Sequence, residues 1–234
     1  MKVMKFGGTS VGSPERMKEV ASLVTKSGEP TFIVLSAMSG TTNALVEISK
    51  YLYKKNPDDA NRVINDLEEK YLSHVEELYS TEKYKTITKD FLFQEFNYIR
   101  SFTNDLFTSF EEKSIVAQGE IISTNMVTNY LLEQGFKTIL LSALDFMRID
   151  KNAEPNSTYI KEKLSSIMKA NEGYQIYITQ GFICRNAYGE VDNLQRGGSD
   201  YTASLVGSAI EAEEIQIWTD IDGMHNNDPR VVDK

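Results

Sequence analysis

The chain has 234 residues, of which 41% are hydrophobic and 25% charged, and its formal net charge is −9 at neutral pH. This size and balance are typical of a soluble globular chain that folds as one large α/β domain or two small ones. The acidic excess argues against a general nucleic-acid-binding protein, because that function needs a basic surface.

The first expected element is a short strand, Val3–Phe6, that carries Lys5 into a Gly-Gly turn. Glycines let the backbone approach a ligand closely, consecutive N–H groups bind an anion, and a lysine adds a mobile positive charge. The candidate ligand-binding residues after the strand are Gly7, Gly8, Thr9 and Ser10. The spacing leaves a phosphate-binding loop and an ordinary strand-to-helix turn equally open. It is not a P-loop, because Ser13-Pro14 stand where that motif requires Lys-Ser/Thr.

A helix is expected after this turn, with Ser13 as N-cap, Pro14 at its first position and a stop near Gly28. Four further short segments, mostly rich in β-branched residues, are expected to be buried strands separated by helices, as in a parallel α/β sheet. They are Thr31–Ser36, Thr138–Ser142, Ile176–Gly181 and Ile215–Trp218.

Residues 43–133 are expected to be almost wholly helical, because apolar side chains recur there at helical spacing. These side chains are Ile64, Leu67, Tyr71, Val75 and Leu78. A second amphipathic stretch, residues 91–110, is dense in aromatic residues, for which core packing is favoured over a partner or dimer surface. The segment Lys151–Ser157 is expected to be a surface loop.

Small hydroxyl residues, Thr42 among them, follow the second expected strand over residues 36–43. Open α/β sheets bind ligands where the carboxyl end of a strand faces a helix N-terminus, although a capping turn explains this segment equally well. Glu120 lies among apolar residues, so it is either at a helix edge or committed to a cation such as a substrate ammonium. On local grounds a solvated glutamate is favoured.

A second glycine-rich turn, residues 195–200, leads into a helix expected over Tyr201–Ile210. Arg196 can grip a carboxylate through two hydrogen bonds, Ser199 can cap the helix, and Asp200 is expected to stay ionised near the helix dipole. A binding site is favoured here over a plain loop.

The segment after the last strand contains Asp220, Asp222 and Arg230. Its acidic residues could hold a metal or a ribose and its arginine a phosphate, while a solvated acidic turn is the alternative.

The few cysteines and histidines narrow the chemistry. Cys184, the only cysteine, is expected to be a buried thiol at a strand end, so neither a disulfide nor a zinc cluster is expected. With only His74 and His225, a histidine-based triad or metal site is disfavoured. Phosphoryl transfer to a carboxylate suits such a chain, because the acceptor is already ionised at neutral pH and catalysis consists of positioning and charge neutralisation.

The sequence shows no signal peptide and no membrane-spanning run, so a cytoplasmic protein without a membrane partner is expected.

Six segments, in this order, resemble the aspartokinases of the amino acid kinase family. They are Lys5–Val11, Leu35–Ala37 with Thr41–Asn43, Gly119–Glu120, Gln180–Phe182, Arg196–Ala203, and Trp218–Asp220 with Asp228–Arg230. The similarity spans essentially the whole chain, and the first and fifth segments are highly specific in combination.

The resemblance implies a fold and a reaction. The fold is an α/β three-layer αβα sandwich around a largely parallel sheet, with an aspartate-binding lobe over about 1–190, a helical insertion over 43–135 and the start of a nucleotide-binding lobe over about 191–234. The reaction is ATP-dependent phosphorylation of the side-chain carboxylate of L-aspartate to 4-phospho-L-aspartate, the first step of lysine, threonine and methionine biosynthesis. Mg²⁺ would be carried by the ATP, and a homodimer or higher homo-oligomer is expected.

The resemblance also assigns the phosphate and nucleotide contacts. Lys5 would stabilise the transferring phosphoryl group, with the Gly7–Ser10 turn (Gly7, Gly8, Thr9 and Ser10) lining its path. The residues facing the nucleotide would be Thr219, Asp220, His225 and Arg230. No set of metal ligands from the protein is implied.

The contacts to aspartate follow in the same way. Arg196 would hold the α-carboxylate and Glu120 the ammonium group. Thr42 and Ser199 would add hydroxyl contacts, and Asp200 would orient the substrate and the active-site cations.

Three features depart from the family pattern. His225 stands where related enzymes often place a tyrosine over the nucleotide, and Gln195 replaces a glycine that often precedes the Arg-Gly-Gly turn. The sequence also stops at Lys234, whereas the family continues with the rest of the nucleotide lobe and usually with C-terminal regulatory ACT domains. The chain is therefore expected to be a catalytic-domain fragment with its C-terminal part missing and with little or no turnover of its own.

Two alternatives stay open. Other members of the family, such as glutamate 5-kinase, acetylglutamate kinase, UMP kinase and carbamate kinase, share the implied fold but not the paired opening and Arg-Gly-Gly-Ser-Asp segments. A catalytically silent amino-acid-binding regulatory module would keep the pocket without the reaction.

Overall fold

The centre of the protein is a five-stranded parallel sheet with the strand order β3-β4-β2-β1-β7. The computed structural model describes residues 1–104, 106–194 and 198–219. The sheet strands are β1 (Lys2–Phe6), β2 (Thr31–Leu35), β3 (Thr138–Leu140), β4 (Ile176–Gln180) and β7 (Glu214–Trp218), and β5 (Ile183–Arg185) and β6 (Val191–Asn193) form a separate antiparallel pair. All five sheet strands coincide with the predicted ones to within about two residues at either end. The prediction that all of them are buried is wrong for β7, which lies at the edge of the sheet and is largely exposed.

The helices lie between the strands, as a parallel sheet requires. They are α1 (Pro14–Thr25), α2 (Thr41–Tyr53), α3 (Pro57–Leu78), α4 (Glu82–Ser101), α5 (Ser109–Glu133), α6 (Ala143–Phe146), α7 (Ser157–Ala170) and α8 (Gly198–Ala209), with a short 3₁₀ turn η1 (Phe102–Asn104). The Ser13 side chain caps α1 as predicted, and Gly28 adopts a positive φ just beyond its end.

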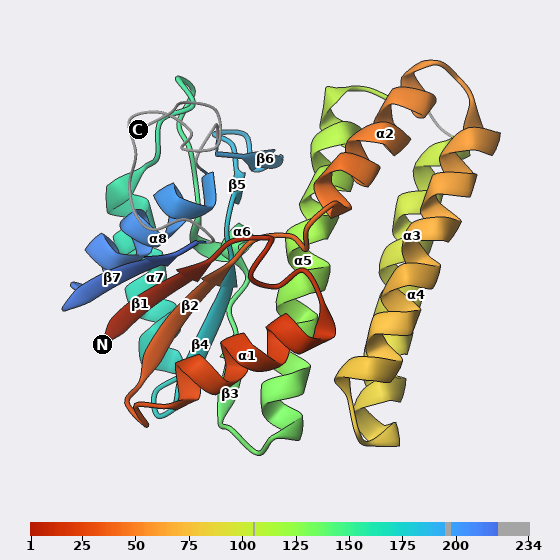
Figure 1. Ribbon diagram of the computed structural model, residues 1–234. Coiled ribbons are helices and arrows are strands. Elements are labelled where there is room, and N and C mark those ends of the chain that lie inside the picture. Colours follow the sequence, from red (N-terminus) through yellow and green to blue (C-terminus); the bar gives the residue numbers. More distant parts are fainter. Residues whose placement is uncertain (105, 195–197, 220–234) are drawn as a thin grey trace, which may run out of the picture.

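Helices cover both faces of the sheet, which confirms the predicted three-layer αβα sandwich (Figure 1). Alternate residues of each strand face opposite layers. In β1, Met4 and Phe6 pack into the apolar cluster with α1 and α5, whereas Val3 packs into the cluster with α7 and α8. Lys5 is two residues after Val3, so its side chain points to the same face of the sheet and faces α8.

The helices α2 to α5 form the predicted helical region, with α3 and α4 as a long hairpin on the side of the molecule away from β7 (Figure 1). The expectation of one amphipathic stretch over 91–110 is wrong, because α4 ends at Ser101 and a capping box at Thr108 starts α5. Core packing holds for Phe96, which is fully buried, but Phe93 is 62% exposed and Phe110 50% exposed.

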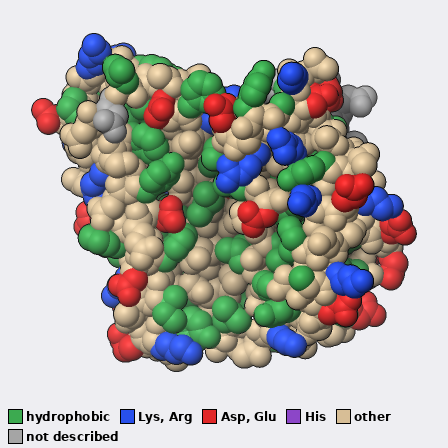
Figure 2. Space-filling view, turned by 180° about the vertical axis from the view of Figure 1, so that it is seen from behind, with side chains coloured by type: hydrophobic (Ala, Val, Ile, Leu, Met, Phe, Trp, Pro, Cys, Tyr) green, Lys and Arg blue, Asp and Glu red, His purple; other side chains and the backbone are tan. Residues whose placement is uncertain are grey.

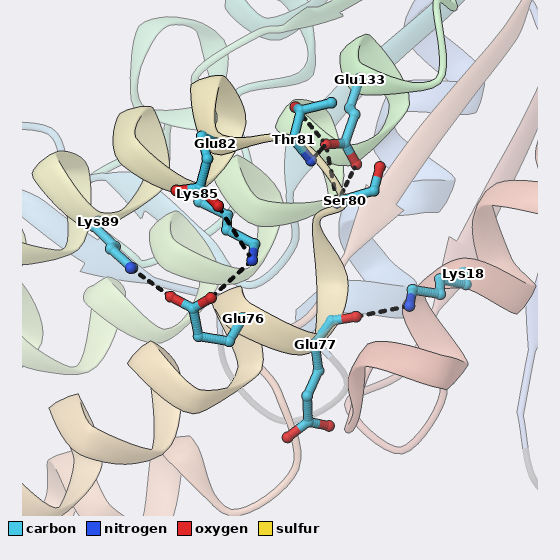
Figure 3. A network of polar contacts seen from close by, with 9 residues as sticks. All are labelled: Lys18, Glu76, Glu77, Ser80, Thr81, Glu82, Lys85, Lys89 and Glu133. Carbon is cyan, nitrogen blue, oxygen red and sulfur yellow. Dashed lines mark hydrogen bonds and ion pairs between the residues drawn. The ribbon is translucent and has the colours of Figure 1, made fainter.

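Polar contacts at the end of this hairpin join four helices (Figure 3). The Glu133 carboxylate at the end of α5 accepts hydrogen bonds from the backbone N–H groups of Ser80 and Thr81, at 3.1 and 2.8 Å, and so satisfies donors at the start of α4. Lys18 of α1 donates to the Glu77 carbonyl of α3 at 2.7 Å. The insertion is thereby fixed to the αβα body.

Candidate functional site

An open pocket of about 460 Å³ lies beyond the carboxyl ends of β1 and β2, beside the first residues of α2 and α8. Six of the predicted site residues line it together: Lys5, Gly8, Thr42, Glu120, Ser199 and Asp200. Gly7, Thr9, Ser10 and Thr219 are not part of its lining. Arg196, Asp220, His225 and Arg230, together with Gln195 and Asp222, lie outside the described residues.

Lys5 supplies a largely buried positive charge to the pocket. The residue is 9% exposed, and its Nζ lies 2.7 Å from the Asp200 Oδ1 in the first turn of α8. A Cβ atom placed on Gly7 would be 3.5 Å from this Nζ, so the ammonium group also lies beside the Gly7 backbone. Lys5, the Gly-Gly turn and Asp200 thus lie together in the structure.

Gly8 holds two loops in close contact. A Cβ atom at Gly8 would be 2.6 Å from the Ala37 carbonyl oxygen, closer than any side chain allows. The Gly8 carbonyl accepts a hydrogen bond from the Ser39 N–H at 3.1 Å. The glycine is needed at this position because the backbone of the loop after β1 packs directly on the loop after β2.

Glu120 is buried, so the local preference for a solvated glutamate is wrong. It is 4% exposed in the middle of α5, and its Oε1 accepts a hydrogen bond from the Ala37 N–H at 3.2 Å. Its Oε2 is buried and has no hydrogen-bond partner among the residues that the structure describes. Burial raises the pKa of this carboxyl group to about 7, although the Ala37 hydrogen bond acts in the opposite direction. A buried carboxylate with one unused oxygen fits a cationic ligand group.

Ser199 lies within α8, whose first residue is Gly198, and is not the N-cap that the sequence suggested. Its hydroxyl instead accepts a hydrogen bond from the Ser36 hydroxyl at 2.9 Å, which joins α8 to the loop after β2. The Ser36 carbonyl in turn accepts from the Ser123 hydroxyl of α5 at 2.7 Å. Asp200 is in the first turn of α8, as predicted, where the helix dipole favours a negative charge.

Two of the other residues that line the pocket, Ser36 and Phe182, lie in segments named in the sequence analysis but were not assigned a role there. Ser36 lines it and makes the contacts just described, and its place at the end of a strand, beside small hydroxyl residues, was the available signal. Phe182 also lines it and has a φ of 67°, which is unusual for a bulky side chain. No pattern in one sequence signals that backbone angle.

The remaining titratable candidates lie apart from the pocket. Cys184 is fully buried in β5, as predicted, and burial raises its pKa to about 12, so its thiol stays protonated. His74 of α3 packs edge-on against Tyr71. No group of three or more His, Cys, Asp or Glu in the described residues could hold a metal ion. Within the same residues, none of the helices combines the length and the apolar character needed to cross a membrane.

The arrangement suits a small ligand that has both an acidic and a cationic end. Lys5 and the N-terminal turns of α2 and α8 favour negative groups, because helix N-termini expose N–H donors and a partial positive charge. Glu120, on the α5 side of the same pocket, favours a positive group.

Sequence comparison finds that a profile of the amino acid kinase family matches residues 1–234. The lysine-sensitive aspartokinase 3 of Escherichia coli (strain K12) is 30% identical over 238 residues, covering 98% of this chain and 51% of that protein. The aspartokinase of Chlamydia muridarum is 30% identical over 242 residues, covering 98% of this chain and 50% of that protein. The chain spans about half the length of these curated relatives.

Solved structures of aspartokinases also resemble this chain. The crystal structure of E. coli aspartokinase III in complex with lysine and aspartate superposes with a TM-score of 0.85 at 30% identity, covering 99% of this chain and 52% of that one. The complex of the same enzyme with aspartate and ADP gives a TM-score of 0.78 at 29% identity, again over 99% of this chain and 52% of that one.

Proposed function

This chain belongs to the amino acid kinase family, and on that premise we propose that it is the catalytic region of an aspartate kinase. The reaction transfers the γ-phosphoryl group of ATP to the side-chain carboxylate of L-aspartate and yields 4-phospho-L-aspartate and ADP, at the start of lysine, threonine and methionine biosynthesis. The similar E. coli enzyme was crystallised with aspartate and ADP, which supports both substrates.

The unused Oε2 of Glu120 is the observation that carries the choice of substrate. A buried carboxylate next to an anion-favouring pocket selects a ligand with an ammonium group and at least one carboxylate. L-Aspartate offers one ammonium and two carboxylates. Glu120 would hold the ammonium. Thr42 and Ser199 line the same pocket, and their hydroxyls would contact the carboxylates.

Lys5 would act on the transferring group. A carboxylate oxygen of aspartate forms the new bond to the γ-phosphorus as the bond from that phosphorus to the ADP oxygen breaks, and no proton must be removed. Negative charge on the phosphoryl oxygens then has to be neutralised, and a buried ammonium beside a glycine backbone suits that task. Mg²⁺ would arrive with the nucleotide, and Asp200 would orient Lys5 through their ion pair.

Other parts of the proposal rest on the resemblance alone. Arg196 is proposed for the α-carboxylate, the Gly7–Ser10 turn for the phosphoryl path, and Thr219, Asp220, His225 and Arg230 for the nucleotide. The aspartate lobe (about 1–190) and the nucleotide lobe (from about 191) would share one sheet, because β7 pairs with β1.

Homo-oligomerisation also belongs to the proposal, because apolar side chains of the insertion are exposed, Phe93 and Phe110 among them. Charged side chains of both signs are scattered between hydrophobic ones on the face seen from behind (Figure 2).

Calorimetry with the purified chain tests the substrate. We expect L-aspartate to bind and succinate, which has the two carboxylates without the ammonium, to bind at least about tenfold more weakly, because a hydrogen-bonded charge contributes ~1.5–3 kcal/mol. Equal affinity for the two dicarboxylates would contradict the assignment of Glu120. Binding of UMP without binding of aspartate would favour another member of the family.

Trapping of the acyl phosphate with hydroxylamine separates a kinase from a silent binding module. With Mg-ATP, L-aspartate and a high concentration of the chain, a kinase gives the aspartyl hydroxamate even at low turnover. Because a silent module binds aspartate and gives none, formation of the hydroxamate would rule out that alternative.

Aspartate binding is also expected to depend on pH. The Glu120 pKa of about 7 means that the carboxyl group is mostly protonated at pH 6 and mostly ionised at pH 8. Because only the ionised form attracts the ammonium, the Kd for L-aspartate should be about tenfold higher at pH 6 than at pH 8. Calorimetric titrations at the two pH values test this, and a constant Kd would show that Glu120 is not the ammonium partner.

A further inference from the structure

Helix α3 of the insertion contacts the loop that walls the pocket. The Tyr71 hydroxyl and the Thr41 Oγ1 are 2.8 Å apart, and both residues are fully buried. One residue earlier on α3, the Lys70 ammonium lies 3.4 Å from the Ser39 carbonyl oxygen. Thr41 begins α2 and immediately precedes Thr42, which lines the pocket.

The Tyr71–Thr41 contact also lies close to the buried carboxylate of the pocket. A Cβ atom at Gly119 would be 3.4 Å from the Thr41 methyl group and 2.8 Å from the Ala37 Cβ, so α5 packs tightly on this loop. The Ala37 N–H is the hydrogen-bond donor to Glu120. Burial raises the pKa of Tyr71, the hydrogen bond with Thr41 lowers it, and the Glu120 charge raises it further, so the phenol stays protonated and can donate.

We propose that Tyr71 is a positioning residue, whose hydrogen bond to Thr41 fixes the loop of residues 36–42 and thereby places Thr42 and the Ala37 donor around the amino-acid ligand. The inference rests on the proposed function for the identity of that ligand. It gives the insertion a direct part in substrate affinity, because α3 holds the loop at both Ser39 and Thr41.

The experiment compares Tyr71→Phe, Thr41→Val and the double variant in the full 234-residue chain. Each single change leaves one buried hydroxyl without its partner, and we expect it to weaken L-aspartate binding about fivefold and to lower the melting temperature. The double variant replaces both polar groups by apolar ones of nearly the same shape, which restores stability without restoring the directional contact. Its melting temperature should therefore recover while its Kd stays raised.

Tyr79→Phe is the matched control. Tyr79 is also buried, at 3% exposed, and its hydroxyl donates to the Met126 carbonyl of α5 at 2.7 Å, but it does not line the pocket. We expect this variant to lose stability and to keep the wild-type Kd. An unchanged Kd in Tyr71→Phe, or a Kd that recovers together with stability in the double variant, would overturn the inference.

Amide hydrogen exchange of the ligand-free chain separates this inference from the proposed function. Tyr71→Phe should accelerate exchange in residues 36–43, and Tyr79→Phe should not. Failure of the wild-type chain to bind L-aspartate would remove the proposed function, whereas unchanged exchange in Tyr71→Phe would overturn the positioning of the loop whatever the ligand is.

Discussion

Replacement of Glu120 by glutamine is expected to weaken L-aspartate binding by about 100-fold and, at the same time, to make the ligand-free chain more stable at pH 8. The loss of affinity follows because the buried Oε2 would no longer carry a charge for the substrate ammonium. Removing one partner of a buried ion pair costs ~3–5 kcal/mol. A 100-fold rise in Kd corresponds to about 2.7 kcal/mol and is therefore a conservative expectation.

The gain in stability follows from the direction of the pKa shift. Burial raises the pKa of Glu120 from its ordinary 4.5 to about 7, so between these values the folded chain binds a proton that the unfolded chain has released. The free energy of unfolding therefore falls as pH rises through this window, and the whole penalty is present above pH 7. Glutamine carries no such penalty, and a gain of about 2 kcal/mol at pH 8 is expected, or roughly 4–8 °C in melting temperature.

Thermal unfolding at pH 5 and pH 8, with calorimetry at pH 8, measures both effects. The stabilisation should be largest at pH 8 and only about a quarter as large at pH 5, where the carboxyl group is neutral in the folded wild-type chain and only the unfolded chain has begun to release its proton. Glu76→Gln is a suitable control, because hydrogen bonds from Lys85 and Lys89 lower the pKa of this exposed carboxyl group to about 2 (Figure 3). It should leave the affinity unchanged and not stabilise the chain. A Glu120→Gln variant that binds L-aspartate normally would rule out the assigned contact.

The sheet could be predicted from the sequence because each strand is a short segment with its own local signal. Buried parallel strands are apolar on both faces, and the five predicted segments match the five strands of the sheet, although the edge strand β7 is largely exposed. The hairpin β5–β6 was not predicted, since its strands are three residues long and carry no such pattern. The end of α4 near Ser101 was also missed, because aromatic residues continue beyond it without a proline or glycine.

The burial of Glu120 could not be predicted from local pattern. Helix α5 lies between the sheet and the α3–α4 hairpin, so the helix is buried on all sides over Ile115–Glu120. Such a helix has no polar face on which to place a charged residue, and periodicity therefore gives no sign of where the carboxylate points. The same holds for Tyr71, which the heptad-like spacing placed in the core without revealing that its hydroxyl reaches Thr41.

Replacement of Gly8 by alanine is expected to destabilise the fold and to disturb the pocket together. The added Cβ would lie 2.6 Å from the Ala37 carbonyl oxygen, and because that oxygen belongs to the backbone, one of the two loops must move. Overpacking of this kind costs ~1–3 kcal/mol, which corresponds to a fall of several degrees in melting temperature for a chain of this size. The displacement should also weaken L-aspartate binding, because the Ala37 N–H donates to Glu120.

Gly7→Ala is the matched control for this steric effect. Among the described residues, its Cβ would meet only the Lys5 Nζ, at the ordinary contact distance of 3.5 Å, and its φ is not positive. We expect the free energy of unfolding of the Gly7 variant to lie within about 0.5 kcal/mol of the wild-type value. Chemical denaturation of the two alanine variants side by side decides the matter. If Gly8→Ala is as stable as Gly7→Ala, the loops after β1 and β2 can separate without cost, and the close backbone contact cannot be what holds Ala37 against Glu120.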